Sequence, residues 1–233
     1  MAHPASGLPR RFVLLLGLGT LAAGVLAACT PKGTDSMPPS STPPTGIAPS
    51  AGGGNGPTSS GKRVLLAYFS RAGENYHYGS RVDLDVGNTQ VLAEMLAGAV
   101  SVDVFRIVAA DPYPHDYDQT VARNLEEEQD DARPRITGDL PDLGGYDTIL
   151  LGSPVWNSQP PMIMRTFIDA LDWTGKTVQP FVTYAVSRMG AVQRDYTQWC
   201  QGATVGDGLA IQGETVNDAR DQTEDWLRQI KLV

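Results

Sequence analysis

Between residues 63 and 230, short apolar runs alternate five times with longer amphipathic segments, and this alternation is the feature that most restricts the fold. A continuous apolar run is typical of a strand buried on both faces, and an amphipathic segment between two such runs is typical of a crossover helix. The pattern therefore predicts an α/β domain built on a parallel sheet. The expected strands are 63–69, 102–107, 148–152, 178–185 and 204–211, and the expected helices are 89–100, 117–130, 161–171, 191–199 and 217–230.

The loop after the first expected strand has the composition of a phosphate-binding loop. The segment Ser70-Arg71-Ala72-Gly73 follows the apolar run directly, and a helical pattern starts again at Asn88-Thr89. Backbone N–H groups and the positive end of a helix dipole at such a junction attract an anion. Ser70 and Thr89 add hydroxyl donors, and Asn88 stands where an N-cap residue is expected.

Two further loops are expected beside the first, because the carboxyl ends of parallel strands share one edge of the sheet, where ligands bind. One contains Pro154-Val155-Trp156-Asn157, in which Trp156 offers a flat surface for stacking and Asn157 a polar amide. The other contributes Thr183, Tyr184 and Ser187. The alternative for Trp156 is a side chain that packs in the core or plugs the surface.

In this order, the segments resemble the flavodoxin family, in the branch that carries a long insertion in its phosphate loop and a Gly-x-Pro-x-Trp segment. The insertion is 74–87, and the second motif is Gly152-Ser153-Pro154-Val155-Trp156. The resemblance implies a doubly wound, five-stranded parallel sheet of strand order 2-1-3-4-5, with FMN as cofactor. The cofactor contacts that it implies are Ser70, Arg71, Ala72, Gly73, Asn88, Thr89, Pro154, Val155, Trp156, Asn157, Thr183, Tyr184 and Ser187.

An FMN protein of this kind is expected to be an electron carrier or an NAD(P)H-dependent oxidoreductase with quinone-type acceptors. The acidic composition favours a carrier that docks on basic redox partners. The aromatic segment 76–78 in the insertion favours an enzyme with a small-molecule acceptor, and predicts that the insertion forms a flap near the flavin. The alternative is a flavin-free binding lipoprotein of the same fold, since Ala72 replaces the usual Thr and the third loop lacks the usual Gly- and Ser-rich turn.

The N-terminal residues have the layout of an export signal, with two arginines, an apolar stretch and small residues before a cysteine. Leu26-Ala27-Ala28-Cys29 resembles the lipobox of bacterial lipoproteins, which implies lipidation of Cys29 and attachment at the extracytoplasmic face of the cell membrane. The alternative is a single transmembrane anchor. Arg10-Arg11 resembles a twin-arginine signal, and a plain basic segment is the alternative.

The expected organisation is therefore an export signal over 1–28, a lipidated, disordered linker over 29–61 and the flavodoxin-like domain over 62–233. Residues 30–61 are almost wholly Pro, Gly, Ser and Thr and cannot bury enough surface to offset their ordering entropy.

Charge and cysteine content exclude several other classes of function. Cleavage after residue 28 would remove two of the 18 basic residues and none of the 26 acidic ones, which leaves a net charge of −10. Such a chain has no basic surface for nucleic acid. Few histidines and one further cysteine, Cys200, argue against a metal site and a disulfide. The acidic run 126–131 is expected to be the solvated face and end of a helix.

Overall fold

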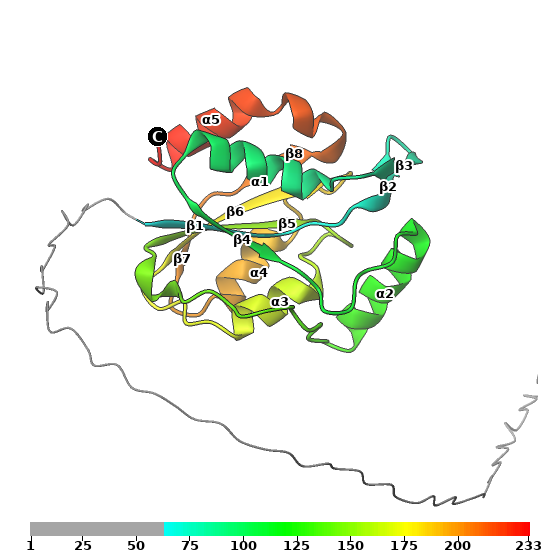
Figure 1. Cartoon of the computed structure of the whole chain (residues 1–233), viewed down its shortest axis with the longest axis horizontal. Helices are drawn as coiled ribbons and strands as arrows, with labels where there is room; N and C mark the ends of the chain where they lie inside the picture. The colour runs from blue at the N-terminus through cyan, green and yellow to red at the C-terminus, as the bar shows by residue number, and fades with distance from the viewer. Residues whose placement is uncertain (1–62) are drawn as a thin grey trace, which may run out of the picture. The chain divides into compact units, whose positions relative to one another are not determined.

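A parallel sheet forms the centre of the molecule, and the computed structural model describes residues 63–233 of the chain. In spatial order its strands are β4 (Asp103–Ile107), β1 (Val64–Phe69), β5 (Thr148–Pro154) and β6 (Thr177–Tyr184), followed by β7 (Thr204–Val205) and β8 (Leu209–Gln212). All these strands pair in parallel, and β7 and β8 both pair with β6 (Figure 1). Because β7 and β8 together occupy the fifth strand position, the predicted fold and the order 2-1-3-4-5 are confirmed.

The fifth strand differs from the prediction, which made it continuous over 204–211. Gly206-Asp207-Gly208 separates β7 from β8. A Cβ atom at Gly208 would lie 3.0 Å from the carbonyl oxygen of Pro180, so the chain passes too close to β6 for a side chain. The indole N–H of Trp226 donates to the carbonyl of Asp207 at 3.0 Å and holds the interruption against the last helix.

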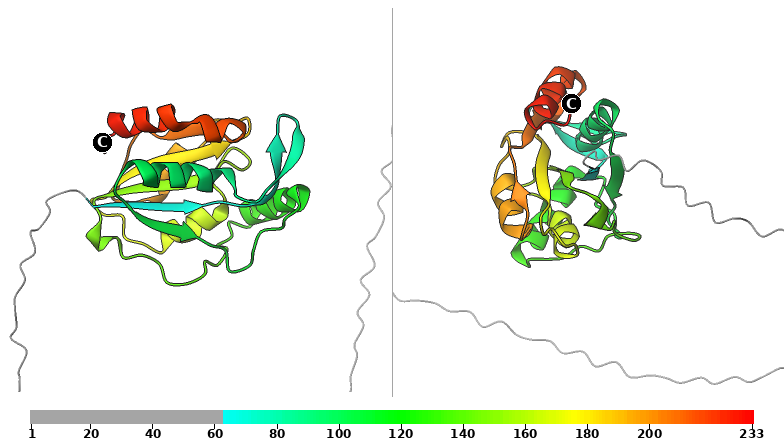
Figure 2. Two further views of the ribbon diagram at one scale, coloured as in Figure 1. Left: turned by 45° about the horizontal axis from the view of Figure 1, so that its top comes forward. Right: turned by 90° about the vertical axis from the view of Figure 1, so that its left-hand side faces the viewer.

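Helices cover both faces of the sheet. α1 (Asn88–Ala99) and α5 (Arg220–Gln229) lie on one face, and α3 (Met162–Asp169) and α4 (Val192–Trp199) lie on the other (Figure 2). Successive side chains of β1 point to opposite faces of the sheet. Leu66 packs with the core residues of α1 and α5, and Leu65 packs with those of α3 and α4. Full burial of each such side chain contributes roughly 1.5–3 kcal/mol. The short helices η1 (Leu143–Gly145) and η2 (Gly213–Asp218) lie in connections.

α2 (Tyr117–Gln129) lies beyond the carboxyl ends of the strands, beside a hairpin of β2 (Gly73–His77) and β3 (Ser80–Leu84) (Figures 1 and 2). This hairpin is the insertion 74–87, for which the sequence predicted no strands. Tyr78 and Gly79 form its turn with φ angles of +47° and +87°, as a tight hairpin turn requires. The structure therefore adds a second layer of side chains above the edge where ligands were expected.

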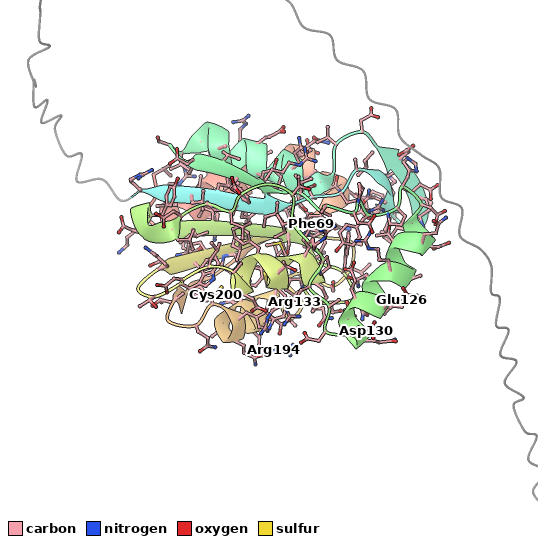
Figure 3. The ribbon with its side chains drawn as sticks, turned by 60° about the horizontal axis from the view of Figure 1, so that its bottom comes forward. Phe69, Glu126, Asp130, Arg133, Arg194 and Cys200 are labelled. Carbon is pink, nitrogen blue, oxygen red and sulfur yellow. The ribbon has the colours of Figure 1, made fainter. Side chains whose placement is uncertain are left out.

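The acidic run on α2 is only partly solvated, which corrects the prediction. Glu126 on α2 and Asp130, the residue that follows it, are exposed (Figure 3). Glu127 is 8% exposed, and its carboxylate accepts from the Tyr113 hydroxyl and from the Arg123 guanidinium, both at 2.7 Å. Tyr113 and Arg123 thus satisfy the Glu127 carboxylate, so its burial at this position is tolerated.

Some predictions concern residues outside the described part of the chain. The export signal over 1–28 and the linker over 29–61, with the lipidation site Cys29, all precede residue 63. Within residues 63–233, no helix is long and apolar enough to cross a membrane.

Cys200 is 1% exposed, and burial raises the pKa of its thiol to about 12, as expected for an inert cysteine.

Candidate functional site

The three loops that the sequence singled out meet in one pocket at the carboxyl end of the sheet. Its cavity volume is about 90 Å³. Of the predicted contacts, it is lined by Ser70, Arg71, Asn88, Thr89, Pro154, Val155, Trp156, Thr183 and Tyr184. The hairpin, α2, the loop after β6 and the segment after β8 contribute residues that sequence reasoning did not place among the contacts. These are Asn75, Tyr76, Tyr117, Ala185, Gly213 and Glu214. We call this hollow the phosphate pocket.

The N-terminus of α1 forms the floor of the phosphate pocket. Gly87, and not Asn88 as predicted, occupies the N-cap position, so the N-cap residue itself has no side chain that could cap the helix. A Cβ atom at Gly87 would lie 2.5 Å from the Ser70 hydroxyl, so only glycine allows the two segments to approach. The Ser70 hydroxyl accepts from the backbone N–H of Gln90 at 3.0 Å, which leaves its own proton free to donate. A helix N-terminus with hydroxyl donors beside it is suited to an anion.

The Arg71 side chain ties the base of the hairpin to the rest of the domain. Its guanidinium donates to the backbone carbonyls of Ala72 and Pro114 at 3.0 Å, to that of His115 at 3.1 Å, and to that of Glu74. Burial lowers the pKa of this guanidinium below its ordinary value. The carbonyl oxygens fix the side chain in place, so Arg71 contributes a positive charge at the border of the pocket while it organises the hairpin.

An acidic residue, Glu214, also borders the phosphate pocket. Its carboxylate accepts from the backbone N–H of Tyr78 in the hairpin turn at 3.1 Å. The hairpin is therefore held at its base by Arg71 and at its tip by Glu214, with Asn75 and Tyr76 on the wall between them. Glu214 lies 136 positions from Tyr78 in the chain, and nothing in its local sequence indicates this contact.

A second hollow of about 340 Å³ adjoins the first and shares Arg71, Val155 and Trp156 with it. We call it the ring-end hollow. The predicted contacts Asn157 and Ser187 lie here, and α2 supplies a wall that the sequence did not predict, made of Thr120, Val121, Asn124 and Leu125.

Trp156 is anchored by aromatic neighbours while it borders both hollows. Its ring packs edge-on against Phe69 at a centroid distance of 5.6 Å and against Tyr113 at 5.1 Å. Trp156 was expected either to offer a stacking surface or to pack in the core. It does both in part, because it packs against Phe69 and Tyr113 and, being half-buried, also borders the site. Such pairs contribute about 0.5–1.5 kcal/mol beyond burial and keep the ring orientation fixed.

Two predicted contacts lie apart from the others. Ala72 and Gly73 border a separate hollow of about 310 Å³, together with Ile107 and Tyr113. Gly73 begins the hairpin with a φ angle of +91°, so a glycine is favoured where the chain changes direction into β2. A Cβ atom there would also lie 2.8 Å from the carbonyl oxygen of His115.

Comparisons with known proteins agree with this geometry. A sequence profile described as Flavodoxin matches residues 63–230. A search of curated proteins gives no match. Crystal structures of flavoprotein candidates from Bacteroides uniformis and Bacteroides eggerthii are both 27% identical to this chain, with TM-scores of 0.56 and 0.58. They cover 72% and 74% of this chain and 99% and 100% of their own.

A flavoprotein from Lactobacillus acidophilus, solved in complex with FMN, is 22% identical, with a TM-score of 0.52. The match covers 69% of this chain and 99% of that one. This likeness shows a shared fold.

Among residues 63–233, no group of three His, Cys, Asp or Glu side chains is placed to hold a metal ion.

Proposed function

Because this chain belongs to the flavodoxin family, we propose that it is an FMN-dependent redox protein that acts on a small-molecule electron acceptor. FMN, the cofactor that the resemblance implied, is supported at the level of the family. The FMN complex of the Lactobacillus acidophilus protein, which has the same fold, supports the same cofactor.

The observation that carries the proposal is the N-terminus of α1 at the pocket floor, with the Ser70 and Thr89 hydroxyls beside it. These groups fit a phosphate, because they are donors gathered at the positive end of a helix dipole. Arg71 adds a fixed positive charge, and Gly87 leaves the space that a side chain would fill. The residues present therefore suit the phosphate end of FMN.

The rest of the cofactor would lie where the two hollows join, beside Val155 and Trp156. When bound, FMN supplies one- and two-electron redox chemistry. The protein's own residues would hold the phosphate and present the Trp156 ring as an aromatic wall. The Trp156 ring is held rigidly by Phe69 and Tyr113, so it can orient a planar partner without rearrangement.

The ring-end hollow favours an enzyme over a protein-to-protein carrier. Its volume of about 340 Å³ lies in the range of small-molecule pockets, and α2 encloses it on the side that faces Trp156. We take a small molecule as the electron acceptor. NAD(P)H or a redox protein is the expected electron donor. The proposed location, the extracytoplasmic face of a membrane, rests on the sequence of residues 10–29 alone.

The proposal is tested by the visible absorption spectrum of the purified chain, before and after addition of FMN. We expect a yellow protein that releases FMN on denaturation, that can be reduced by dithionite, and that is reoxidised by a soluble quinone. The release of FMN and not FAD is checked by chromatography. A colourless protein that does not bind added FMN would favour the flavin-free binding lipoprotein.

A further inference from the structure

Trp156 has an oxidisable neighbour behind it. Its ring packs edge-on against the Tyr113 ring, with an interplanar angle of 76° and a centroid distance of 5.1 Å. Trp156 borders the phosphate pocket and the ring-end hollow, whereas Tyr113 borders the separate hollow beside Ile107. Indole and phenol are readily oxidised side chains, and rings in contact can exchange an electron. A one-electron oxidant at the pocket wall would therefore meet two donors in series.

The Tyr113 hydroxyl has its own proton acceptor. It donates to one carboxylate oxygen of Glu127 at 2.7 Å. Glu127 is 8% exposed, and its other carboxylate oxygen accepts from the Arg123 guanidinium at 2.7 Å. Burial, together with the charge of the neighbouring carboxylate, raises the pKa of the Tyr113 phenol, so the phenol keeps its proton at neutral pH. The proton and its acceptor are thus in position before any oxidation takes place.

Arg123 determines the charge that an oxidised Tyr113 can carry. The central carbon of its guanidinium lies 4.1 Å from the centre of the Tyr113 ring, over the ring face. A positive charge so close makes a second positive charge on the ring unfavourable. Loss of an electron from the phenol must therefore be accompanied by loss of its proton. A phenol that has lost an electron is a far stronger acid than a carboxylic acid, so Glu127 can take this proton although it pairs with Arg123.

A second tryptophan–tyrosine pair in the domain has a different proton acceptor. Tyr196 and Trp199 on α4 have ring centroids 6.3 Å apart. Tyr196 is fully buried, and its hydroxyl donates to the Ser153 hydroxyl at 3.2 Å. A hydroxyl oxygen is a much weaker base than a carboxylate. Of these two pairs, the one at the pocket wall is therefore the one equipped for loss of an electron and a proton together.

We propose that Trp156, Tyr113 and Glu127 form a one-electron relay that carries an oxidising equivalent away from the pocket wall. An oxidising radical in the pocket takes one electron from the Trp156 indole and is itself reduced by one electron. The oxidised indole then takes one electron from Tyr113, and the phenolic proton moves to the Glu127 carboxylate. Trp156 is restored, and the products are a neutral tyrosyl radical and a neutral carboxylic acid. Electron transfer to an acceptor molecule does not require the relay, which is thus a function separate from the proposed one.

Azide radicals generated by pulse radiolysis of the purified full chain test the relay. At neutral pH they take an electron from tryptophan in preference to tyrosine, and they act whether or not FMN is bound. We expect the absorption of the tryptophan radical to decay while that of the tyrosyl radical grows within the same molecule. This growth should be about twofold slower in D₂O, because a proton moves with the electron. Decay of the tryptophan radical without a tyrosyl radical in the wild type would overturn the proposal.

Two conservative variants identify the tyrosine. Tyr113→Phe keeps the ring and removes the hydroxyl, and it should abolish the growth of the tyrosyl absorption. Tyr196→Phe is the matched control at the other tryptophan–tyrosine pair, and it should keep the growth at the wild-type rate. Equal growth in the wild type and Tyr113→Phe would overturn the relay, and so would loss of growth in Tyr196→Phe alone.

Glu127→Gln tests the proton acceptor. The glutamine oxygen can still accept a hydrogen bond from the phenol, but it is not a base. We expect the tyrosyl absorption to grow at least about tenfold more slowly, since a positioned base contributes about 10²–10⁴-fold to a proton transfer. The slower rate should also be seen against Glu126→Gln, the same change at an exposed position on α2. An unchanged rate in Glu127→Gln would overturn the assignment of Glu127 as the proton acceptor.

Discussion

The hydroxyl oxygens of Thr89 and Thr183 lie 2.7 Å apart, although 94 positions separate the two residues in the chain. Both side chains are buried, at 2% and 4% exposed, and both border the phosphate pocket. This contact joins the first turn of α1 to the end of β6. Because a hydroxyl pair needs one proton for its own hydrogen bond, the other proton is free for a ligand. The pair thus closes the pocket and keeps one donor for the phosphate.

The double variant Ser70→Ala/Thr89→Ala tests the phosphate site. Each hydroxyl would give a hydrogen bond to a charged phosphate, worth roughly 1.5–3 kcal/mol. We expect FMN to bind at least about tenfold more weakly, since 1.4 kcal/mol corresponds to a factor of ten. The measurement is a titration by quenching of flavin fluorescence. Riboflavin, which has no phosphate, serves as the control and should change little; an unchanged dissociation constant for FMN would place the phosphate elsewhere.

Glu214→Gln tests the effect of a carboxylate beside the phosphate pocket. The glutamine oxygen can still accept from the Tyr78 N–H, so the hairpin contact is retained while the negative charge is lost. We expect FMN to bind a few-fold more tightly at low ionic strength, because repulsion between Glu214 and the phosphate disappears. The gain should shrink at high salt, since counterions screen charges of this kind. Weaker FMN binding by the variant would show that the carboxylate is needed in its charged form.

The strands and the three loops could be predicted because they depend on local patterns, and the strand order was implied by the resemblance to the flavodoxin family. Continuous apolar runs such as 63–69 and 148–152 recur along the chain, and the topology of parallel sheets then brings their ends together. The position of α2 could not be predicted in this way. Its N-terminal turn is fixed by Glu74, whose carboxylate accepts from the backbone N–H of Tyr117 at 3.2 Å, and by Arg81, which lies 3.7 Å above the Tyr117 ring. These partners come from the hairpin, which itself has no strong strand pattern.

The acids on α2 illustrate the same limit. Three consecutive glutamates predict a solvated helix face, and only the contacts formed in three dimensions distinguish them. Glu127 is buried by Tyr113 and Arg123, Glu128 holds two amides, and Glu126 is exposed. Likewise, Asn88 is of a residue type that favours the N-cap position. The N-cap of α1 is nevertheless Gly87, because the close approach of Ser70 leaves no room for a side chain there. The sequence thus predicted the residue types at these positions, but not which residues they contact in the folded chain.

Cys29→Ser tests the proposed anchor. If the thiol of Cys29 is lipidated, its replacement by a hydroxyl should release the domain from the membrane fraction, because the acyl chains would be missing. The measurement is fractionation of cells that express the wild-type or variant chain, followed by a wash at high salt. Cys200→Ser is the matched control and should leave the distribution unchanged, since Cys200 is buried in the domain. A variant that stays membrane-bound would favour the transmembrane anchor.

Arg71→Lys tests whether the guanidinium holds the hairpin to the domain. A lysine ammonium has three donors on one nitrogen and cannot reach the carbonyls of Ala72, Glu74, Pro114 and His115 together. Loss of one hydrogen bond from a charged donor, worth about 1.5–3 kcal/mol, should already raise the open population of the hairpin at least about tenfold. Opening is measured by the rate at which trypsin cuts after Arg81, an exposed residue of β3, with the products identified by mass spectrometry.

The control for this experiment is Arg63→Lys, the same substitution at an exposed site before β1, whose guanidinium pairs with Asp103 at 3.1 Å. It should leave cleavage after Arg81 at the wild-type rate. FMN should slow the cleavage in the wild type, because the hairpin residues Asn75 and Tyr76 border the phosphate pocket. If Arg71→Lys and Arg63→Lys are cut after Arg81 equally fast, the hairpin does not depend on Arg71. Its attachment must then come from its other contacts, those of Glu74 and Arg81 with Tyr117 and that of Glu214 with the turn.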